Sequence, residues 1–136
     1  MGLFNVFDVS GSALTAQSVR LNTISSNLAN AEVVSSSEDA VYRAKHPYFS
    51  TVFNGFGEGS SGGVRVERVV TSQVPPRKEY QPSHPLADEQ GYIYMPNVNL
   101  VEEMANMISA SRSYQSNVEA MNTAKQLIVR TLSLGR

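Results

Sequence analysis

The stretch of residues 100–134, LVEEMANMISASRSYQSNVEAMNTAKQLIVRTLSL, carries the most regular apolar pattern in the chain. Alternating steps of four and three residues from its first leucine meet an apolar side chain at eight of ten positions, a period of 3.5 residues. The eight apolar positions are Leu100, Met104, Met107, Tyr114, Val118, Met121, Ile128 and Leu132. This period predicts one amphipathic helix of about 50 Å. Its apolar stripe needs cover, and another helix would supply it.

Signals at both ends of this stretch agree with a single helix. Asn99 stands at the N-cap position, and Glu102 follows three residues later, as in a capping box. Glu102 and Glu103 also place negative charge at the positive end of the helix dipole. Gly135 follows the last apolar residue, where a glycine stop belongs.

The N-terminal segment predicts a second helix that ends near Asn30. Apolar residues recur on one of its faces, at Leu14, Leu21, Ile24, Leu28 and Ala31. The opposite face carries neutral polar side chains, and Asp8 and Arg20 are the charged residues of the first 31. A neutral polar face can be buried when its amides and hydroxyls find partners. We therefore expect protein around most of this helix.

The middle of the chain, residues 32–96, has a different character. It holds all six prolines and six of the nine glycines. Five short runs predict strands, at residues 40–43, 49–53, 64–71, 77–81 and 92–95, and the Gly/Ser-rich run 55–63 predicts a flexible loop.

The predicted fold class is α+β, with long N- and C-terminal helices that pair as a coiled-coil-like hairpin around a small β-rich, loop-rich insertion. The predicted segments are the N-terminal helix 1–31, the insertion 32–96 and the C-terminal helix 97–136. The apolar stripes of the two helices are expected to face each other.

Composition excludes several classes of function. The net charge is −1 with no basic block, so no nucleic-acid partner is expected. The chain has no cysteine, which excludes disulfides and thiolate metal sites. Its longest apolar run, residues 92–95, is too short to insert into a membrane, and the start lacks the basic region of a cleaved signal peptide.

Catalytic chemistry is not indicated. His46 and His84 each precede a proline, and neither has a second ligand at metal-binding spacing. Asp88 and Glu89 follow His84 in a turn that reads as a solvated connection. No nucleophile elbow or phosphate-binding loop is present. We therefore predict no catalytic residue, no metal and no cofactor, and a protein that is not an enzyme.

Both ends of the chain carry a family resemblance. The C-terminal run from Pro96 to Met104, with ISASRSYQ at 108–115, NTAK at 122–125 and TLSLG at 131–135, is similar to the tail of flagellar basal-body rod proteins. The run LNTISSNLANA at 21–31 resembles the signature shared by rod, hook and hook-associated axial proteins. One departure is that Glu32, Val33 and Val34 follow the signature, where many axial proteins have a threonine and often Gly-Tyr.

The resemblance implies a structural subunit of the proximal rod, the periplasm-spanning part of the bacterial flagellar drive shaft that transmits motor torque. It implies export through the flagellar type III apparatus without a cleaved signal peptide. It also implies termini that become helical when copies of the chain and other rod subunits pack into a tube, and both terminal helices, 1–31 and 97–136, are then expected to form its inner coiled-coil layer.

The residues expected to pack between subunits lie on the two apolar stripes. They are Leu14, Leu21, Ile24, Leu28, Leu100, Met104, Met107, Tyr114, Val118, Met121, Ile128 and Leu132, with Asn27 and Asn30 expected to form polar pairs. The alternative is a soluble helical chaperone or adaptor that binds a partner helix through the same amphipathic ends.

Overall fold

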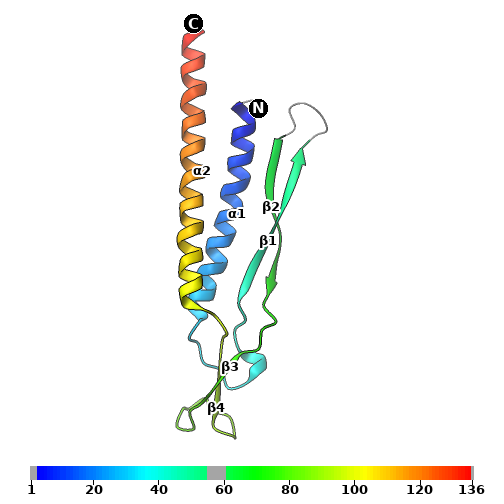
Figure 1. Ribbon diagram of the computed structural model, residues 1–136, viewed down its shortest axis with the longest axis vertical. Coiled ribbons are helices and arrows are strands. Elements are labelled where there is room, and N and C mark those ends of the chain that lie inside the picture. The colour runs from blue at the N-terminus through cyan, green and yellow to red at the C-terminus, as the bar shows by residue number, and fades with distance from the viewer. Residues whose placement is uncertain (1–2, 55–60, 136) are drawn as a thin grey trace. The chain divides into compact units, whose positions relative to one another are not determined.

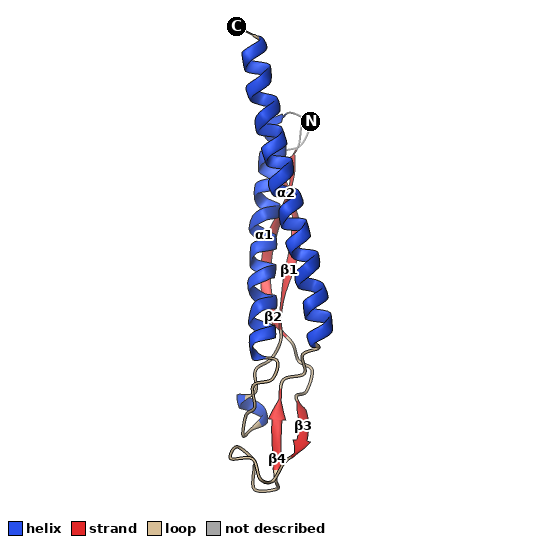
Figure 2. Ribbon diagram, turned by 90° about the vertical axis from the view of Figure 1, so that its left-hand side faces the viewer, coloured by secondary structure: helices blue, strands red, loops and turns tan. Residues whose placement is uncertain are grey.

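The computed structural model describes residues 3–54 and 61–135, and it places two long helices at the ends of the chain (Figure 1). Helix α1 spans Leu3–Asn30, and helix α2 spans Leu100–Leu134. Two small antiparallel sheets lie between them in sequence, one formed by β1 and β2 and the other by β3 and β4 (Figure 2). The strands are β1 Lys45–Asn54, β2 Ser61–Thr71, β3 Arg77–Tyr80 and β4 Tyr92–Met95. The predicted α+β class, two long helices flanking a β-rich insertion, is confirmed.

The chain folds as two compact units, and each contains part of both helices. The ribbon unit comprises residues 1–21, 47–68 and 108–136, and so includes most of the two-stranded β1–β2 ribbon. The hairpin unit comprises residues 22–46 and 69–107, and so includes the β3–β4 hairpin.

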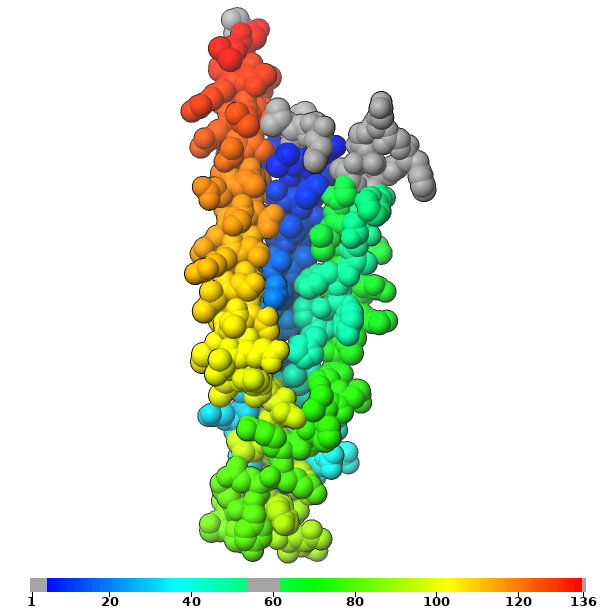
Figure 3. Space-filling view, viewed as in Figure 1, coloured from blue at the N-terminus to red at the C-terminus, as the bar shows by residue number. Residues whose placement is uncertain are grey.

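In the ribbon unit, α1 lies between α2 and the β1–β2 ribbon (Figures 1 and 3). Gly11 faces α2, since a Cβ added there would lie 3.9 Å from the Met121 Cε. The next residue, Ser12, faces the ribbon, and its Oγ accepts a hydrogen bond of 3.1 Å from the Val64 N–H. A Cβ on Gly63 would lie 3.2 Å from that Oγ, so glycine allows the start of β2 to approach α1 closely.

Four of the five predicted strands are observed, and the strand predicted at 40–43 is wrong. A short 3₁₀ helix, Glu38–Ala40, is closed by a hydrogen bond from the Ala40 N–H to the Ser37 carbonyl (3.3 Å), and residues 41–43 that follow it are irregular. Val41 is buried and Tyr42 bonds to α1 through its hydroxyl, so their side chains anchor this segment without a strand partner. Of the predicted loop 55–63, residues 55–60 lie outside the described residues, and 61–63 belong to β2.

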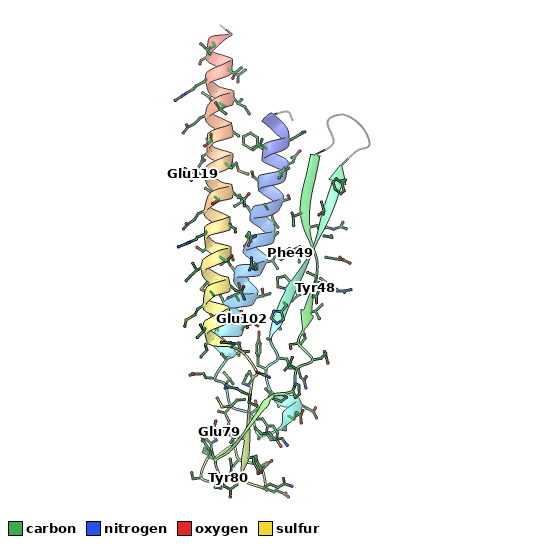
Figure 4. All side chains as sticks on the ribbon, viewed as in Figure 1. Tyr48, Phe49, Glu79, Tyr80, Glu102 and Glu119 are labelled. Carbon is green, nitrogen blue, oxygen red and sulfur yellow. The ribbon has the colours of Figure 1, made fainter. Side chains whose placement is uncertain are left out.

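The β3–β4 hairpin ends in a tightly hydrogen-bonded turn. Tyr80 pairs with Tyr92 in the ladder, and their rings meet edge to face at 5.3 Å (Figure 4 labels Tyr80). The Asp88 Oδ1 accepts hydrogen bonds from the N–H groups of Gln90 (2.9 Å) and Tyr92 (2.8 Å). Gly91 has a φ of +82°, and a Cβ there would lie 2.9 Å from the Tyr80 ring, so both conformation and space require glycine.

The Asp88 carboxylate makes this turn sensitive to acid. Its pKa lies below the ordinary value of 3.8, chiefly because the Tyr92 N–H donates to it, and the Gln90 N–H, the Tyr94 hydroxyl and the charge of Lys78 add to the effect. A carboxyl whose folded-state pKa is depressed stabilises the fold above its unfolded pKa, and the contribution is lost as pH falls through the folded pKa.

We therefore expect amide exchange of residues 88–95, corrected for its intrinsic pH dependence, to accelerate as pH falls below 3.8. NMR of the free chain during an acid titration measures this. Asp88→Asn should remove the acid step, because the amide oxygen still accepts hydrogen bonds and does not titrate in this range. An unchanged acid step in Asp88→Asn would assign it to another group.

Candidate subunit-packing surface

Small side chains occupy the most buried positions of the ribbon unit. Helices α1 and α2 run in opposite directions (Figure 1), and among the described residues the fully buried apolar side chains of this unit are three alanines. These are Ala16, Ala110 and Ala124, which are 3%, 0% and 4% exposed. Ala110 and Ala124 lie on the side of α2 that carries Met121, which meets Gly11 of α1, so we place these two alanines in the seam between the helices. Ala16 follows Ser12 by four residues and so lies on the side of α1 that faces the ribbon. Small side chains at a contact let helix axes lie close together.

The seam on α2 runs beside the predicted stripe and coincides with only part of it. Ala110, Asn117 and Ala124 recur every seven residues and face inward, with Ala110 and Ala124 buried and Asn117 half-buried. The predicted stripe residues Met107, Val118, Met121 and Ile128 are half-buried along the same helix. These four side chains are thus partly used within the subunit, and less of each remains for a neighbour.

A shallow groove of about 530 Å³ lies beside the seam in the ribbon unit. It is lined by Phe7, Asp8, Lys125, Ile128 and Val129. Its walls are largely apolar, and it carries one carboxylate and one ammonium group. Such a surface offers the chemistry that the side chains of an adjacent amphipathic helix can match.

In the hairpin unit, Asn27 joins α1 to the segment that enters β1. Its Oδ1 accepts hydrogen bonds from the Lys45 N–H (2.8 Å) and the Tyr42 hydroxyl (2.9 Å), and its Nδ2 donates to the Lys45 carbonyl (3.0 Å). The Tyr42 hydroxyl also lies 3.1 Å from the Ser26 Oγ. Asn27 is 1% exposed. We call Asn27, Tyr42 and Lys45 the Asn27 clasp.

The other predicted packing residues of α1 lie mostly inside the subunit. Ile24 is 5% exposed, whereas Leu14, Leu21 and Leu28 are half-buried. The Asn30 Nδ2 donates to the Ser26 carbonyl at 2.8 Å, so this amide is satisfied within its own helix. On α2, Leu100 packs against a small core in the hairpin unit made by Ala31, Ala44 and Val98.

Three predicted packing residues of α2 remain open to solvent. Met104 is 55%, Tyr114 37% and Leu132 69% exposed. Sequence reasoning missed five further exposed apolar side chains on α2, namely Val101 (77%), Ile108 (57%), Leu127 (49%), Val129 (58%) and Leu134 (87%). These residues could have been found in the sequence, because they are apolar residues of the same helix that lie outside the 3.5-residue repeat.

The last turns of α2 carry apolar side chains in several directions. At about 100° per residue, Leu127 and Leu134 share one side, whereas Val129 and Leu132 point to other sides. Ile128 is half-buried towards α1. Polar residues such as Lys125, Arg130 and Ser133 lie between them, so this end of α2 offers several separate apolar side chains to solvent.

Exposed apolar side chains also occur on both faces of the β1–β2 ribbon. Tyr48, Phe49 and Phe53 of β1 are 52%, 42% and 75% exposed, and Val64 and Val69 of β2 are 37% and 45% exposed. Figure 4 labels Tyr48 and Phe49 on this ribbon. The Arg68 guanidinium lies 5.4 Å from the Tyr48 ring centroid, a cation–π contact within the sheet.

The described part of the chain contains neither a cluster of metal ligands nor a membrane-spanning helix. Within residues 3–54 and 61–135, no group of three His, Cys, Asp or Glu side chains is placed to hold a metal ion. None of the described helices is both long enough and apolar enough to cross a membrane.

Comparison with known proteins identifies the family. Residues 7–34 match the model of the flagella basal body rod protein, and residues 89–134 match that of the flagellar basal body rod FlgEFG protein C-terminal region. Flagellar basal-body rod protein FlgC is 52% identical in Escherichia coli and 49% identical in Salmonella typhimurium, each over 100% of both chains. The Buchnera aphidicola protein of the same name is 42% identical over 99% of both chains. This chain therefore belongs to the FlgC family of flagellar basal-body rod proteins.

Proposed function

We propose that this structural rod subunit forms part of the proximal rod, where its two terminal helices pack with copies of itself and with other rod subunits into a tube that transmits motor torque. Membership of the rod family supports the structural role, and the chain is not an enzyme. The observation that carries the packing mechanism is the end of α2, where exposed apolar side chains point in several directions.

The exposed side chains of α2 can supply the driving force for this assembly. Burying a valine, leucine or isoleucine that was in water contributes roughly 1.5–3 kcal/mol. Ile108, Val129, Leu132 and Leu134 are each more than half exposed, so neighbours that cover them gain several such contributions. Contacts that repeat head to tail between non-identical patches build an open helical array, which is what a tube requires.

The packing residues predicted from the sequence fall into three groups under this proposal. Met104, Tyr114 and Leu132 are the members with most surface available to a neighbour. Leu14, Leu21, Leu28, Leu100, Met107, Val118, Met121 and Ile128 are half-buried and would serve both their own subunit and its neighbours. Ile24, Asn27 and Asn30 would act indirectly, by stabilising the C-terminal end of α1 inside the subunit.

We also propose that the subunit is exported by the flagellar type III apparatus and resides in the rod across the periplasm. Family membership supports this placement. The exposed aromatic residues of the β1–β2 ribbon would then fix the spacing of neighbours outside the helical layer. The alternative role as a helical chaperone or adaptor gains no support from the relatives, which are named as rod proteins.

Leu132→Asp tests the proposal. Leu132 is 69% exposed, so the substitution should leave the free subunit folded but put a charge where a neighbour packs, and a buried unpaired charge is strongly disfavoured. In cells whose only copy carries Leu132→Asp, we expect swimming to fall to the level of a deletion strain and rods to be missing from purified basal bodies.

The matched control is Ser133→Asp, which places the same charge in the same exposed last turn of α2. Both variants add an equal, unfavourable interaction with the helix dipole, so a difference between them reports packing. Normal swimming of the Leu132→Asp strain would remove this side chain from the subunit interface.

A further inference from the structure

The charges of the chain are divided unevenly between its two units. The ribbon unit has seven arginine or lysine residues and four acidic residues, whereas the hairpin unit has four arginine or lysine residues and eight acidic ones. The ribbon unit is therefore net basic and the hairpin unit net acidic, although the whole chain has a net charge of only −1. Opposite charges steer and orient proteins that approach each other. Two copies of this chain are thus complementary in charge when the ribbon unit of one meets the hairpin unit of the other.

A basic hollow lies on the C-terminal part of α2, in the ribbon unit. It has a volume of about 380 Å³ and is lined by Asn122, Lys125, Gln126, Val129 and Arg130. The described residues that line it include no carboxylate, although Lys125 also borders the neighbouring groove that contains Asp8. Ammonium, guanidinium and amide N–H groups all donate hydrogen bonds to a carboxylate, and Val129 adds an apolar side chain that is 58% exposed. The basic hollow therefore fits a carboxylate that stands beside an apolar side chain.

The first turn of α2, in the hairpin unit, has this combination. Val101 is 77% exposed, and the adjacent Glu102 is exposed as well. Glu103 is only 6% exposed, so Glu102 is the carboxylate of this turn that a neighbour can reach. Val101 also borders a groove of about 400 Å³ that is lined by the Glu32 carboxylate and the Arg77 guanidinium, among others. A neighbour that covers this turn would therefore meet two carboxylates and one guanidinium, a net acidic surface.

We propose that the basic hollow of one copy binds the first turn of α2 of a second copy. The Glu102 carboxylate lies between Lys125 and Arg130 of the adjacent copy. Val101 packs against Val129. This contact specifies one part of the packing in the proposed function and rests on it.

The two surfaces can join only separate copies. They lie at opposite ends of one continuous helix, so they cannot meet within a chain. Because the two surfaces differ, a copy that uses its basic hollow still presents its first turn of α2 to the next copy. The contact therefore repeats head to tail without closing on a pair.

Disulfide cross-linking in assembled rods tests this contact. The chain has no cysteine, so the double variant Val101→Cys with Val129→Cys carries thiols only at the two positions that should meet. Both side chains are exposed, so the substitutions should leave the subunit folded. After oxidation of purified basal bodies, we expect dimers and longer multimers of this chain. Each single variant should stay unlinked, because the contact does not bring identical positions together.

Three cross-linking results would overturn the proposal. Rods that assemble without linked multimers would show that the two surfaces do not meet. A link only to a different rod protein would assign the surface to that partner, and equal linking of a single variant would indicate a symmetric contact. In all three cases rods still assemble, so the contact fails while the proposed function stands.

Exchange of charges gives a second test that does not depend on the cysteines. Glu102→Lys alone, and Lys125→Glu with Arg130→Glu, should each lower the number of rods in purified basal bodies at least about tenfold, because like charges then face each other. Combining the three substitutions should restore rods, since opposite charges face each other again. Normal rod numbers in Glu102→Lys, or a lasting defect in the combined variant, would overturn the proposal.

The matched control is Glu119→Lys, the same change at an exposed site of α2 outside both surfaces (Figure 4). By itself it should leave the number of rods unchanged. Combined with Lys125→Glu and Arg130→Glu, it should not restore assembly. Restoration by Glu119→Lys would show that net charge matters and the position of Glu102 does not, which would also overturn the proposal.

Discussion

Replacing Asn27 with alanine is expected to lower the free energy of unfolding of the hairpin unit by about 2–4 kcal/mol. The amide of Asn27 is 1% exposed and makes three hydrogen bonds of 2.8–3.0 Å to Tyr42 and Lys45. Alanine would leave a backbone N–H, a backbone carbonyl and a hydroxyl without this partner. Buried groups that lose a partner each cost about 1–3 kcal/mol, and water reaching the exposed Lys45 offsets part of that cost.

Urea unfolding of the free chain, followed by tyrosine fluorescence, measures this effect. The substitution should lower the midpoint, and Ser25→Ala should stay within about 0.5 kcal/mol of the native chain because it changes an exposed helix site. Asn27→Asp is informative as well. Aspartate keeps both hydrogen bonds that the Asn27 oxygen accepts but loses the one donated to the Lys45 carbonyl. The free energy of unfolding of Asn27→Asp should therefore lie between those of Asn27→Ala and the native chain. A loss below about 1 kcal/mol in Asn27→Ala would mean that the clasp is not a main support of the fold.

The role of Asn27 also shows what sequence reasoning could reach and what it could not. The neutral polar face of α1 predicted a helix surrounded by protein on most sides. Asn27 of this face is buried and has partners outside the helix, whereas Thr15, Ser18 and Ser25 are exposed in the subunit. The identity of the partner could not be predicted, because Lys45 lies 18 residues away and offers its backbone, which no side-chain pattern reveals. The same segment explains the wrong strand at 40–43, since Tyr42 has a strand-forming side chain whose hydroxyl is used to reach α1.

The limits of the α2 helix were predicted well, and the face that meets α1 was predicted only in part. The Asn99 cap and the apolar repeat are local signals, and the structure places the helix at Leu100–Leu134. The stripe was followed at 3.5 residues per turn, whereas a straight helix drifts from that repeat by about 20° per heptad. Alanine also carries little weight in an apolar pattern, so the seam at Ala110 and Ala124 was missed although it is the most buried part of this helix in the ribbon unit.

This distinction changes which residues should be tested for assembly. The sequence alone favours Met107, in the middle of the stripe, but Met107 is half-buried, so a charge there would damage the subunit as well as its contacts. Leu132 and Ile108 separate the two effects because they are exposed. The buried seam residues Ala110 and Ala124 are tested differently, by replacing a small side chain with a larger apolar one.

Ala110→Leu is expected to abolish rod assembly while leaving the free hairpin unit as stable as in the native chain. Ala110 is 0% exposed in the seam of the ribbon unit, and the larger side chain would force α1 and α2 apart. Overpacking of a tight contact typically costs about 1–3 kcal/mol. The displaced helices would also present a thicker pair to every neighbour, so we expect the effect to be repeated at each subunit of the tube.

Swimming of cells that carry Ala110→Leu, together with urea unfolding of the purified chain, measures both parts of this prediction. The matched control is Ala105→Leu, the same substitution at an exposed position of α2, which should be nearly neutral for stability. If Ala110→Leu cells swim normally, the seam tolerates a wider helix pair and the small residues are not needed for assembly. If the variant instead destabilises the free hairpin unit, the two units fold together, and the ribbon unit is already formed before the subunit joins the rod.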